Sequence, residues 1–351
     1  MVINIGAPLP LNRLVLKHSL LTLLRRFISL SGILFCLCCQ ESVELTSIKG
    51  QALGTTYQIK LDSKSLDPSE LTKRLDSIFS IVNHSMSTYV PTSIISKVNS
   101  ENTSITVDAH FEHVFRSSQE IWKKTNGYFD PTVGPLVDAY GFGPQGIQKL
   151  NQQHIDSLKQ FIGLDKVSID HGVLTKQNAE ISLDFNAIAK GYTVDIVGQY
   201  LNDLQVENFL IELGGEVLVQ GMNPQSKTHW SIGIENPILD SLPRILKVVE
   251  LKNQAQATSG NYRKFWVDSL SGKRYVHTIN PITGLIQDSK VLSVSVIAQT
   301  CTQADAMATA LLAMPFKQGK ALIQREKDFE ALWIYTDNTQ VATHQSPGFG
   351  L

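Results

Sequence analysis

The feature that most constrains this chain is an alternating segment followed directly by an apolar, helix-forming one, at residues 291–314. In VLSVSVIA (291–298) apolar residues alternate with serines, which predicts a strand. CTQADAMATALLAM (301–314) predicts a helix with Thr302 as its N-cap and Asp305 three positions on, in the manner of a capping box. We therefore expect a strand that leads into a helix with polar groups in its first turns.

Two polar residues of this helix form a candidate metal site. Asp305 and Thr309 are four positions apart, so a carboxylate and a hydroxyl lie one turn apart on a single helical face. Hard cations such as Mg²⁺ take oxygen ligands of this kind and usually add phosphate oxygens of a substrate. In the alternative interpretation Asp305 only caps the helix and Thr309 packs, and this pair alone does not decide between the two.

Length, composition and absent motifs limit the remaining possibilities. The chain has 351 residues, 42% hydrophobic and 18% charged, which is typical of a soluble globular protein with one large domain or two ordinary ones. Its net charge of −1 gives no reason to expect nucleic acid as a partner. The motifs G-x-x-x-x-G-K-[ST], G-x-G-x-x-G after a strand, H-E-x-x-H and G-x-S-x-G are absent. A phosphate or nucleotide site here therefore does not rest on a Rossmann or P-loop fold.

The N-terminus differs from the body of the chain. Scattered positive charges at residues 13–26 precede a short apolar run, FISLSGILFCLCC (27–39), which indicates a secretory signal rather than a transmembrane helix. The run ends in cysteines, which indicates a bacterial lipoprotein with Cys39 as the lipid-bearing residue. Cys38 departs from the usual lipoprotein signal, because it stands where a small residue is usual. The alternative is an uncleaved anchor. Outside the run Cys301 is the one cysteine, so the sequence offers no disulfide framework and no zinc-binding cysteine pair.

Periodicity and chain breakers predict the main elements of the body. Asp67-Pro68 with Glu70 begins a helix that runs to Met86, and a second helix spans residues 109–124. The expected strands are residues 50–60 with a Gly-Thr kink, 181–183, a hairpin over 208–221 that turns at Gly214-Gly215, 230–234, 245–251 and a last strand after Phe329. Residues 151–172 are expected to form a surface excursion.

A segment rich in glycine, proline and aromatic residues, GYFDPTVGPLVDAYGFGP (127–144), is expected to form neither a regular helix nor a regular strand. A rigid aromatic loop fits a planar ligand, because Tyr and Phe offer stacking faces at low entropic cost. The alternative is a structural loop packed on the core.

A candidate phosphate site lies where a helix is predicted to begin after Asp184. Asn186 is the expected cap of a helix over residues 187–204, whose free amides and positive dipole end suit a phosphate. Lys190 stands in the first turn, where its charge opposes the dipole unless an anion is bound; a solvated surface lysine is the alternative. Gly191 inside the helix costs about 1 kcal/mol relative to alanine, which indicates close approach by another group.

His277 is a candidate general base. It lies among strand-like residues just before a Pro-Ile-Thr-Gly turn (281–284), where an imidazole can reach a ligand and accept a proton. A structural histidine is the alternative.

Taken together, these segments resemble the ApbE-type FAD:protein FMN transferases. The matching segments are ALGTTY (52–57), MSTYVPTSIISKVN (86–99), TNGYFDPTVGPLVDAYGFGP (125–144), SLDFNAIAKGYTVD (182–195), LIELGGE (210–216), ATSGNYRKF (257–265), HTINPITG (277–284) and ADAMATA (304–310). Their order and spacing hold from Gly50 to Pro315. Two departures are Asn280, where the family usually has aspartate, and the irregular lipobox.

The resemblance implies a set of site residues. FAD contacts are implied for Leu53 (where the family usually has Met), Tyr89, Tyr128, Phe129, Asp130, Asp184, Lys190 and Ile279. Mg²⁺ would be held by the side chains of Asp305 and Thr309 and by the backbone carbonyl of Ala187. His277 matches the histidine tied to catalysis.

The resemblance also implies the reaction. A threonine or serine hydroxyl of a target protein would attack the phosphorus of the FMN half of FAD, and AMP would leave. His277 would accept the hydroxyl proton, with Asp305 as the alternative base. Two other functions stay open: an FAD pyrophosphatase with water as the acceptor, and a flavin-binding lipoprotein that does not catalyse.

Fold, organisation and location follow from the same resemblance. The implied fold is α+β, a mixed α/β unit of two lobes with the FAD site between them. The expected organisation is a signal and lipoprotein segment (1–39), a short tether (40–49) and a flavin transferase domain (50–351). The protein would be anchored by its N-terminal lipid to the bacterial inner membrane, facing the periplasm. Its targets would be flavoproteins such as subunits of respiratory NADH oxidoreductases.

Overall fold

The computed structural model describes residues 45–62, 66–100, 104–142, 150–238, 243–261, 265–267, 274–276, 278–286, 290–337 and 340–350, with the backbone alone for 265–267 and 274–276. The predicted signal segment and His277 lie outside these residues. Within them, no helix combines the length and the apolar character needed to cross a bilayer.

An antiparallel sheet of eight strands forms the framework, in the order β1-β2-β6-β7-β10-β13-β14-β15. The strands are β1 (Thr46–Ala52), β2 (Thr55–Leu61), β6 (Phe209–Leu213), β7 (Glu216–Gln220), β10 (Ala255–Gly260), β13 (Val291–Ala298), β14 (Glu330–Asp337) and β15 (Gln340–Gln345). β13 has the predicted bounds, and β1 begins within the stretch predicted as a tether. The combination of this sheet with helices confirms the α+β class, while the arrangement in two lobes stays a prediction.

The first hairpin corrects one expectation. Ala52 pairs with Thr55, and the two residues between them, Leu53 (φ 48°) and Gly54 (φ 74°), form the turn. The single kinked strand predicted for residues 50–60 is therefore wrong, because its Gly-Thr step is the corner of a hairpin. Positive φ at both central positions is the geometry of a type I′ turn, in which leucine is uncommon. Leu53 is half-buried and packs against two apolar clusters of the core, which compensates for its backbone conformation.

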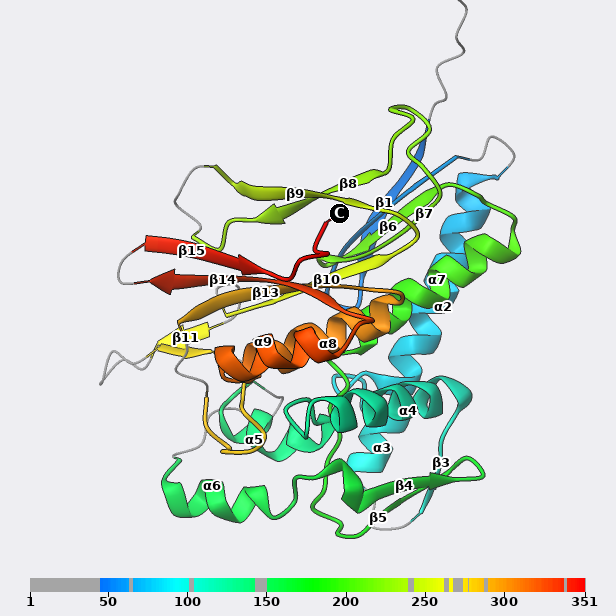
Figure 1. Ribbon diagram of the computed structural model, residues 1–351. Coiled ribbons are helices and arrows are strands. Elements are labelled where there is room, and N and C mark those ends of the chain that lie inside the picture. The colour runs from blue at the N-terminus through cyan, green and yellow to red at the C-terminus, as the bar shows by residue number, and fades with distance from the viewer. Residues whose placement is uncertain are drawn as a thin grey trace, which may run out of the picture. The chain divides into compact units, whose positions relative to one another are not determined.

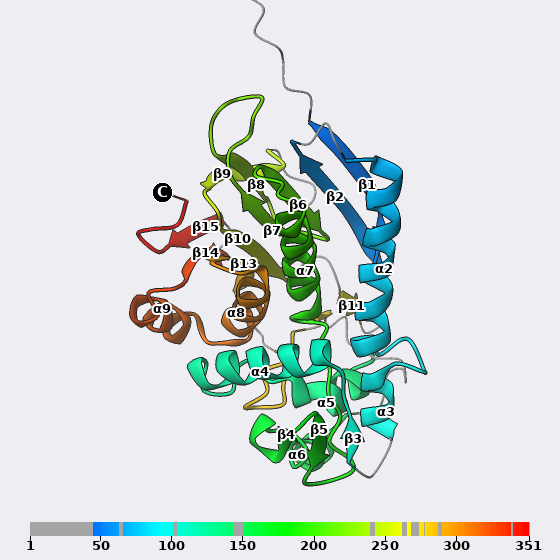
Figure 2. The same ribbon diagram turned by 90° about the vertical axis from the view of Figure 1, so that its right-hand side faces the viewer.

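Three helices cover one face of the sheet: α2 (Pro68–Met86), α7 (Ala189–Asp203) and α8 (Cys301–Ala313) (Figure 2). α7 lies over β6 and β7, and α8 lies over β7, β10 and β13. α2 begins as predicted: the side chain of Asp67 accepts a hydrogen bond from the amide of Ser69 (2.9 Å), and Pro68 opens the helix.

The opposite face of the sheet is covered by a separate hairpin, β8 (Trp230–Glu235) and β9 (Ile245–Leu251). Both strands were predicted, β9 with the same bounds. Val217 and Val219 of β7 belong to the apolar cluster between this hairpin and the sheet. Because successive side chains of a strand point to opposite faces, Glu216 and Leu218 point to the helices.

The remaining elements include α4, which packs against α2 and α8, and a small sheet in the order β3-β5-β4 (Figure 1). They are α3 (Ile94–Ser100), β3 (Ile105–Thr106), α4 (Ala109–Lys124), η1 (Pro131–Val133), α5 (Gly134–Ala139), α6 (Gln152–Lys159), η2 (Leu164–Lys166), β4 (Val167–Asp170), β5 (Val173–Lys176), β11 (Phe265–Val267), β12 (Arg274–Val276) and α9 (Phe316–Arg325). α4 has the predicted bounds. The segment 127–144 contains the short helix α5, so it is less irregular than predicted, and the predicted surface excursion 151–172 contains α6 and β4.

The starts of α7 and of α8 differ from the sequence predictions. Residues 181–183 form no strand. α7 begins at Ala189, two residues later than expected, because the amide of Asn186 donates to Oδ1 of Asp184 (2.7 Å) in a turn that precedes the helix. α8 begins at Cys301, and its N-cap is Thr300, whose hydroxyl accepts from the amide of Gln303. Asp305 therefore lies in the second turn and does not take part in a capping box.

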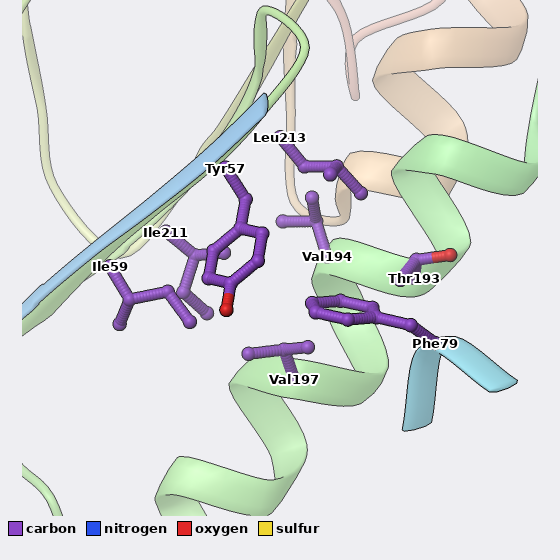
Figure 3. A pocket seen from close by; sticks show the side chains of 8 residues that line it. All are labelled: Tyr57, Ile59, Phe79, Thr193, Val194, Val197, Ile211 and Leu213. Carbon is purple, nitrogen blue, oxygen red and sulfur yellow. The ribbon is translucent and has the colours of Figure 1, made fainter. Parts of the chain in front are cut away.

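A small cavity of about 10 Å³ lies in the core between β2, β6, α2 and α7 (Figure 3). Its lining consists of Tyr57, Ile59, Phe79, Thr193, Val194, Val197, Ile211 and Leu213. A space of this size holds one water molecule at most, and the lining is almost entirely apolar. It is a packing defect of the core and not a site for a nucleotide.

Candidate functional site

A buried cluster of three charged side chains lies where α7, α8 and β7 meet. The ammonium of Lys190 lies 3.0 Å from Oε1 of Glu216 and 3.5 Å from Oδ2 of Asp305. The side chains of Glu216 and Asp305 are each 4% exposed, and that of Lys190 is 28% exposed. The alternative of a solvated surface lysine is therefore wrong for Lys190.

Local structure explains how each charge reaches this point. Lys190 is in the first turn of α7 and Asp305 in the second turn of α8. Glu216 follows the predicted turn at Gly214 (φ 65°) and Gly215 (φ 106°), which is confirmed, and pairs with Leu213. A two-residue turn fixes the register, so the first side chain of β7 is held over the start of α7.

Gly191 allows α7 and α8 to approach closely. A Cβ built at this position would lie 2.3 Å from the carbonyl oxygen of Cys301 and 2.8 Å from Cβ of Asp305. The predicted close approach of another group to Gly191 is thus confirmed, and the group is the first turn of α8. The contact brings the amide of Gly191 to 3.0 Å from Oδ2 of Asp305, to which it donates a hydrogen bond.

Asp195, one turn further along α7, fixes the start of α8. Its carboxylate accepts hydrogen bonds from the amides of Cys301 (2.8 Å) and Thr302 (2.8 Å) and from the hydroxyl of Thr302. These amides belong to the first turn of α8, where no intrahelical partner exists. The two helices are therefore joined by one carboxylate beside the charged cluster.

At the cluster, burial and the oppositely charged neighbours shift the pKa of Lys190, and likewise that of Glu216, in opposite directions. Burial alone would lower the pKa of Lys190, but the carboxylates of Asp305 and Glu216 raise it above its ordinary value, so the side chain stays charged. Burial raises the pKa of Glu216 to about 7; the ammonium of Lys190 opposes this shift and Asp305 adds to it. With both acids ionised, two carboxylates against one ammonium leave one net negative charge.

Several oxygen atoms at the cluster lack hydrogen-bond partners within the part of the chain that the structure describes. Oε2 of Glu216 is buried and receives no hydrogen bond, and Oδ1 of Asp305 receives none. The amide of Gly191, which would bond the carbonyl of Ala187 in a regular helix, donates to Asp305 instead. The Ala187 carbonyl is therefore without that partner.

These oxygens fit a hard divalent cation. Carboxylate, hydroxyl and carbonyl oxygens are the ligands that Mg²⁺ takes, and the net negative charge favours a cation. Thr309, one turn after Asp305, has a half-buried hydroxyl that lies 3.0 Å from the hydroxyl of Ser259 on β10. Among the described residues, no three His, Cys, Asp or Glu side chains are grouped closely enough to hold a metal by themselves. A cation here would thus need the Thr309 hydroxyl, the Ala187 carbonyl or substrate oxygens.

Asp130, in the aromatic loop, is satisfied by the protein itself. Oδ1 accepts from the amide (2.8 Å) and the hydroxyl (2.6 Å) of Thr132, and Oδ2 accepts from Nε1 of Trp122 (3.0 Å) and from the amide of Leu164 (3.2 Å). Asp130 as a residue is 6% exposed. These bonds favour a structural role for Asp130 over the implied contact with FAD.

The aromatic residues of this loop differ in their availability. Phe129 is 3% exposed and belongs to the apolar core, so its ring offers no free face, which favours the structural alternative for this side chain. Tyr128 is half-buried at the edge of the same cluster. The loop also contacts other implied site segments: the amide of Asp184 donates to the carbonyl of Pro131 (2.7 Å), and the hydroxyl of Tyr140 donates to the carbonyl of Gly284 (3.1 Å).

The remaining implied residues lie in different environments. Tyr89 is 66% exposed in the loop after α2. Asp184 is half-buried. The pKa of the nearby Asp138 is raised, first by the burial of Asp138 itself and second by the negative charge of Asp184. Ile279 is buried and pairs with Ile286 in an isolated bridge. His277 lies outside the described residues.

Asn280 forms a hydrogen-bonded turn at the position where the resemblance implies an aspartate. Its Oδ1 accepts from the amides of Ile282 (2.9 Å) and Thr283 (3.2 Å), and its carbonyl accepts from the amide of Gly284 (2.8 Å). An amide oxygen serves this purpose as well as a carboxylate oxygen, so the departure leaves the turn intact.

Sequence reasoning missed three residues of this region: Glu216, Asp195 and Ser259. Glu216 gives the clearest signal, since it is an acid directly after a Gly-Gly turn and at the start of the apolar strand EVLVQ. Asp195 lies inside the matching segment SLDFNAIAKGYTVD, and Ser259 inside ATSGNYRKF. Their partners are distant in sequence, so local patterns alone do not identify their roles.

Comparisons with known proteins agree on one family. The profile of the ApbE family matches residues 53–333. An FAD:protein FMN transferase of Haemophilus influenzae is 34% identical over 322 residues, which cover 88% of this chain and 92% of that protein. An FAD:protein FMN transferase of Vibrio cholerae is 31% identical over 317 residues, covering 89% of this chain and 94% of that protein.

Solved structures agree with the sequence comparisons. The flavin transferase ApbE from Vibrio cholerae superposes with a TM-score of 0.78 at 30% identity, over 87% of this chain and 97% of that one. The apo form of the Pseudomonas stutzeri flavinyl transferase ApbE gives a TM-score of 0.78 at 28% identity, over 87% of this chain and 95% of that one.

Proposed function

We infer that this chain, which belongs to the ApbE family, is an FAD:protein FMN transferase that moves FMN from FAD to a threonine or serine hydroxyl of a target protein. The observation that carries the inference is the cluster of Lys190, Glu216 and Asp305 beside the carbonyl of Ala187, which accepts no hydrogen bond from the described residues. It combines a fixed positive charge with free hard oxygens at one place. Phosphoryl-type transfer needs these two features, because negative charge spreads over phosphate oxygens in its transition state.

The side chains have separate roles in the proposed reaction. Lys190 would bind the diphosphate of FAD and stabilise its charge. Asp305, Thr309 and the Ala187 carbonyl would hold Mg²⁺, which when bound neutralises diphosphate oxygens. The target hydroxyl oxygen forms a bond to the FMN phosphorus, the bond from that phosphorus to the bridging oxygen breaks, and AMP leaves with that oxygen. The hydroxyl proton goes to His277, the proposed base.

We further propose a periplasmic location, with Cys39 bearing the lipid that anchors the protein to the inner membrane. The basic and apolar pattern of residues 13–39 supports this proposal. Target flavoproteins such as subunits of respiratory NADH oxidoreductases would meet the enzyme on that side of the membrane. Replacement of Cys39 by Ser should release the protein from the membrane fraction, while an unchanged distribution would favour an uncleaved anchor.

The decisive experiment is a mass measurement on the acceptor. Purified protein is incubated with FAD, Mg²⁺ and a candidate acceptor protein, and the acceptor is weighed by mass spectrometry while AMP is quantified. We expect an FMN adduct on the acceptor in equal amount to AMP. Free FMN and AMP without an adduct would identify a pyrophosphatase, and the absence of AMP would identify a binding protein. Chelation with EDTA should abolish both products, and added Mg²⁺ should restore them.

A further inference from the structure

The ammonium of Lys190 has two carboxylate partners, and the closer one is not the implied metal ligand. Nζ lies 3.0 Å from Oε1 of Glu216 but 3.5 Å from Oδ2 of Asp305. Oδ2 of Asp305 is also held by the amide of Gly191 at 3.0 Å. Lys190 is therefore paired with both carboxylates, more closely with Glu216 than with Asp305.

We infer that Glu216 is a positioning residue of the flavin-transfer site, which draws the Lys190 ammonium toward itself, weakens the ion pair of Lys190 with Asp305 and so leaves Asp305 available to a divalent cation. The inference rests on the proposed function, since it concerns the same site. It concerns the competition between two cations, the lysine ammonium and the metal ion, for a single carboxylate.

The charges of the cluster support this role. Without Glu216, Lys190 and Asp305 would form a buried neutral ion pair, and a metal ion would have to displace the ammonium from its only partner. With Glu216 present, two carboxylates share the ammonium, and the cluster keeps one net negative charge for the metal. Interactions at distances of 3–6 Å in a partly buried site are strong enough for one charge to change cation affinity about tenfold or more.

The unpartnered oxygen of Glu216 is the second observation. Oε2 is buried and receives no hydrogen bond from the described residues, although the side chain is only 4% exposed. Leaving a buried carboxylate oxygen unbonded is unfavourable. A donor brought with the ligand, such as a water on the cation, would satisfy it.

The test measures Mn²⁺ as a spectroscopic substitute for Mg²⁺. The full chain is saturated with FAD at pH 8 without an acceptor protein, and free Mn²⁺ is followed by electron paramagnetic resonance. Glu216→Gln should raise the Kd for Mn²⁺ about tenfold. Adding Lys190→Met to this variant should bring the Kd back to within about threefold of the wild-type value, because the competing ammonium is gone. Glu120→Gln, which removes an exposed acid of α4, should leave the Kd unchanged and serves as the control for net charge.

The recovery of Mn²⁺ binding in the double variant distinguishes a positioning role of Glu216 from a merely structural one. If Glu216 only stabilised the fold, removing Lys190 would not restore Mn²⁺ binding, and the double variant would bind as weakly as Glu216→Gln or more weakly. Unchanged binding in Glu216→Gln would also overturn the inference. Should Glu216→Gln not fold, Lys190→Met alone decides: we expect it to bind Mn²⁺ at least as tightly as the wild type, and weaker binding would contradict competition. FMN transfer by the wild type, measured in parallel, tests the proposed function independently.

Discussion

Gly191 of α7 lies so close to the carbonyl of Cys301 in α8 that a Cβ at position 191 would be 2.3 Å from that oxygen. The contact involves backbone, which cannot move aside as a side-chain end can. Gly191→Ala should therefore lower the free energy of unfolding by about 1–3 kcal/mol, as overpacking does, in spite of the higher helix propensity of alanine. Urea unfolding measures the change.

The same helix offers a matched control. A Cβ at Gly198 would meet Cδ2 of Leu218 at 2.5 Å, which is the far end of a flexible side chain. Gly198→Ala should consequently be close to neutral. Equal effects of the two substitutions would mean that the contact between α7 and α8 is not tight at Gly191.

Asp195 is expected to stabilise the start of α8. In Asp195→Asn, one of the two oxygens that accept from Cys301 and Thr302 becomes an amide nitrogen, which faces a donor. The loss should be about 1–2 kcal/mol, the range of a lost N-terminal cap. Thermal unfolding of Asp203→Asn, at the exposed end of the same helix, gives the reference. If both variants unfold at the same temperature, the carboxylate of Asp195 does not fix α8.

The role of Asp195 also explains where sequence reasoning succeeded and where it failed. The bounds of α4, β9 and β13 were predicted correctly because caps and alternation are local signals. The start of α8 was misplaced at Thr302, because its hydroxyl donates to a residue 107 positions away instead of capping the helix. Tertiary hydrogen bonds of this kind leave no trace in the local pattern.

The sequence likewise predicted only part of the candidate site. Asp305 and Lys190 were identified from helix position and charge, and the structure brings them within 3.5 Å. Glu216 was missed, because its place beside Lys190 depends on the register of a hairpin and on the packing of α7 over it. Leu53 illustrates the same limit: its positive φ is supported by packing on the core, and leucine is not a residue that signals a type I′ turn.

The hydroxyl of Tyr192 should ionise at a higher pH than that of an ordinary tyrosine. Burial, and then the negative charges of Asp108 and Asp195, raise its pKa to about 12. Because the folded-state pKa exceeds the unfolded value of about 10, the stabilisation is complete below about pH 10 and is lost as the pH rises through 12. In an absorbance titration of tyrosinate, Tyr192→Phe should remove one tyrosine from the step near pH 12.

A control and a second measurement accompany this titration. Tyr89→Phe, in an exposed loop, should leave the step near pH 12 in place. The free energy of unfolding of the wild type should fall more steeply between about pH 10 and 12 than that of Tyr192→Phe. Identical slopes would contradict the raised pKa, and so would an unchanged step near pH 12 in Tyr192→Phe.

Replacement of Asp130 tests whether this side chain stabilises the fold or contacts FAD directly. Both of its oxygens accept two hydrogen bonds from the chain, so Asp130→Asn places an amide group against donors at a buried position. The free energy of unfolding without FAD should fall by about 2–3 kcal/mol. Asp138→Asn in the neighbouring helix α5 should cost little, because burial and the charge of Asp184 already disfavour its ionised form. If Asp130→Asn instead keeps full stability without FAD but binds FAD weakly in a fluorescence titration, Asp130 contacts the flavin nucleotide directly, as the family resemblance implies.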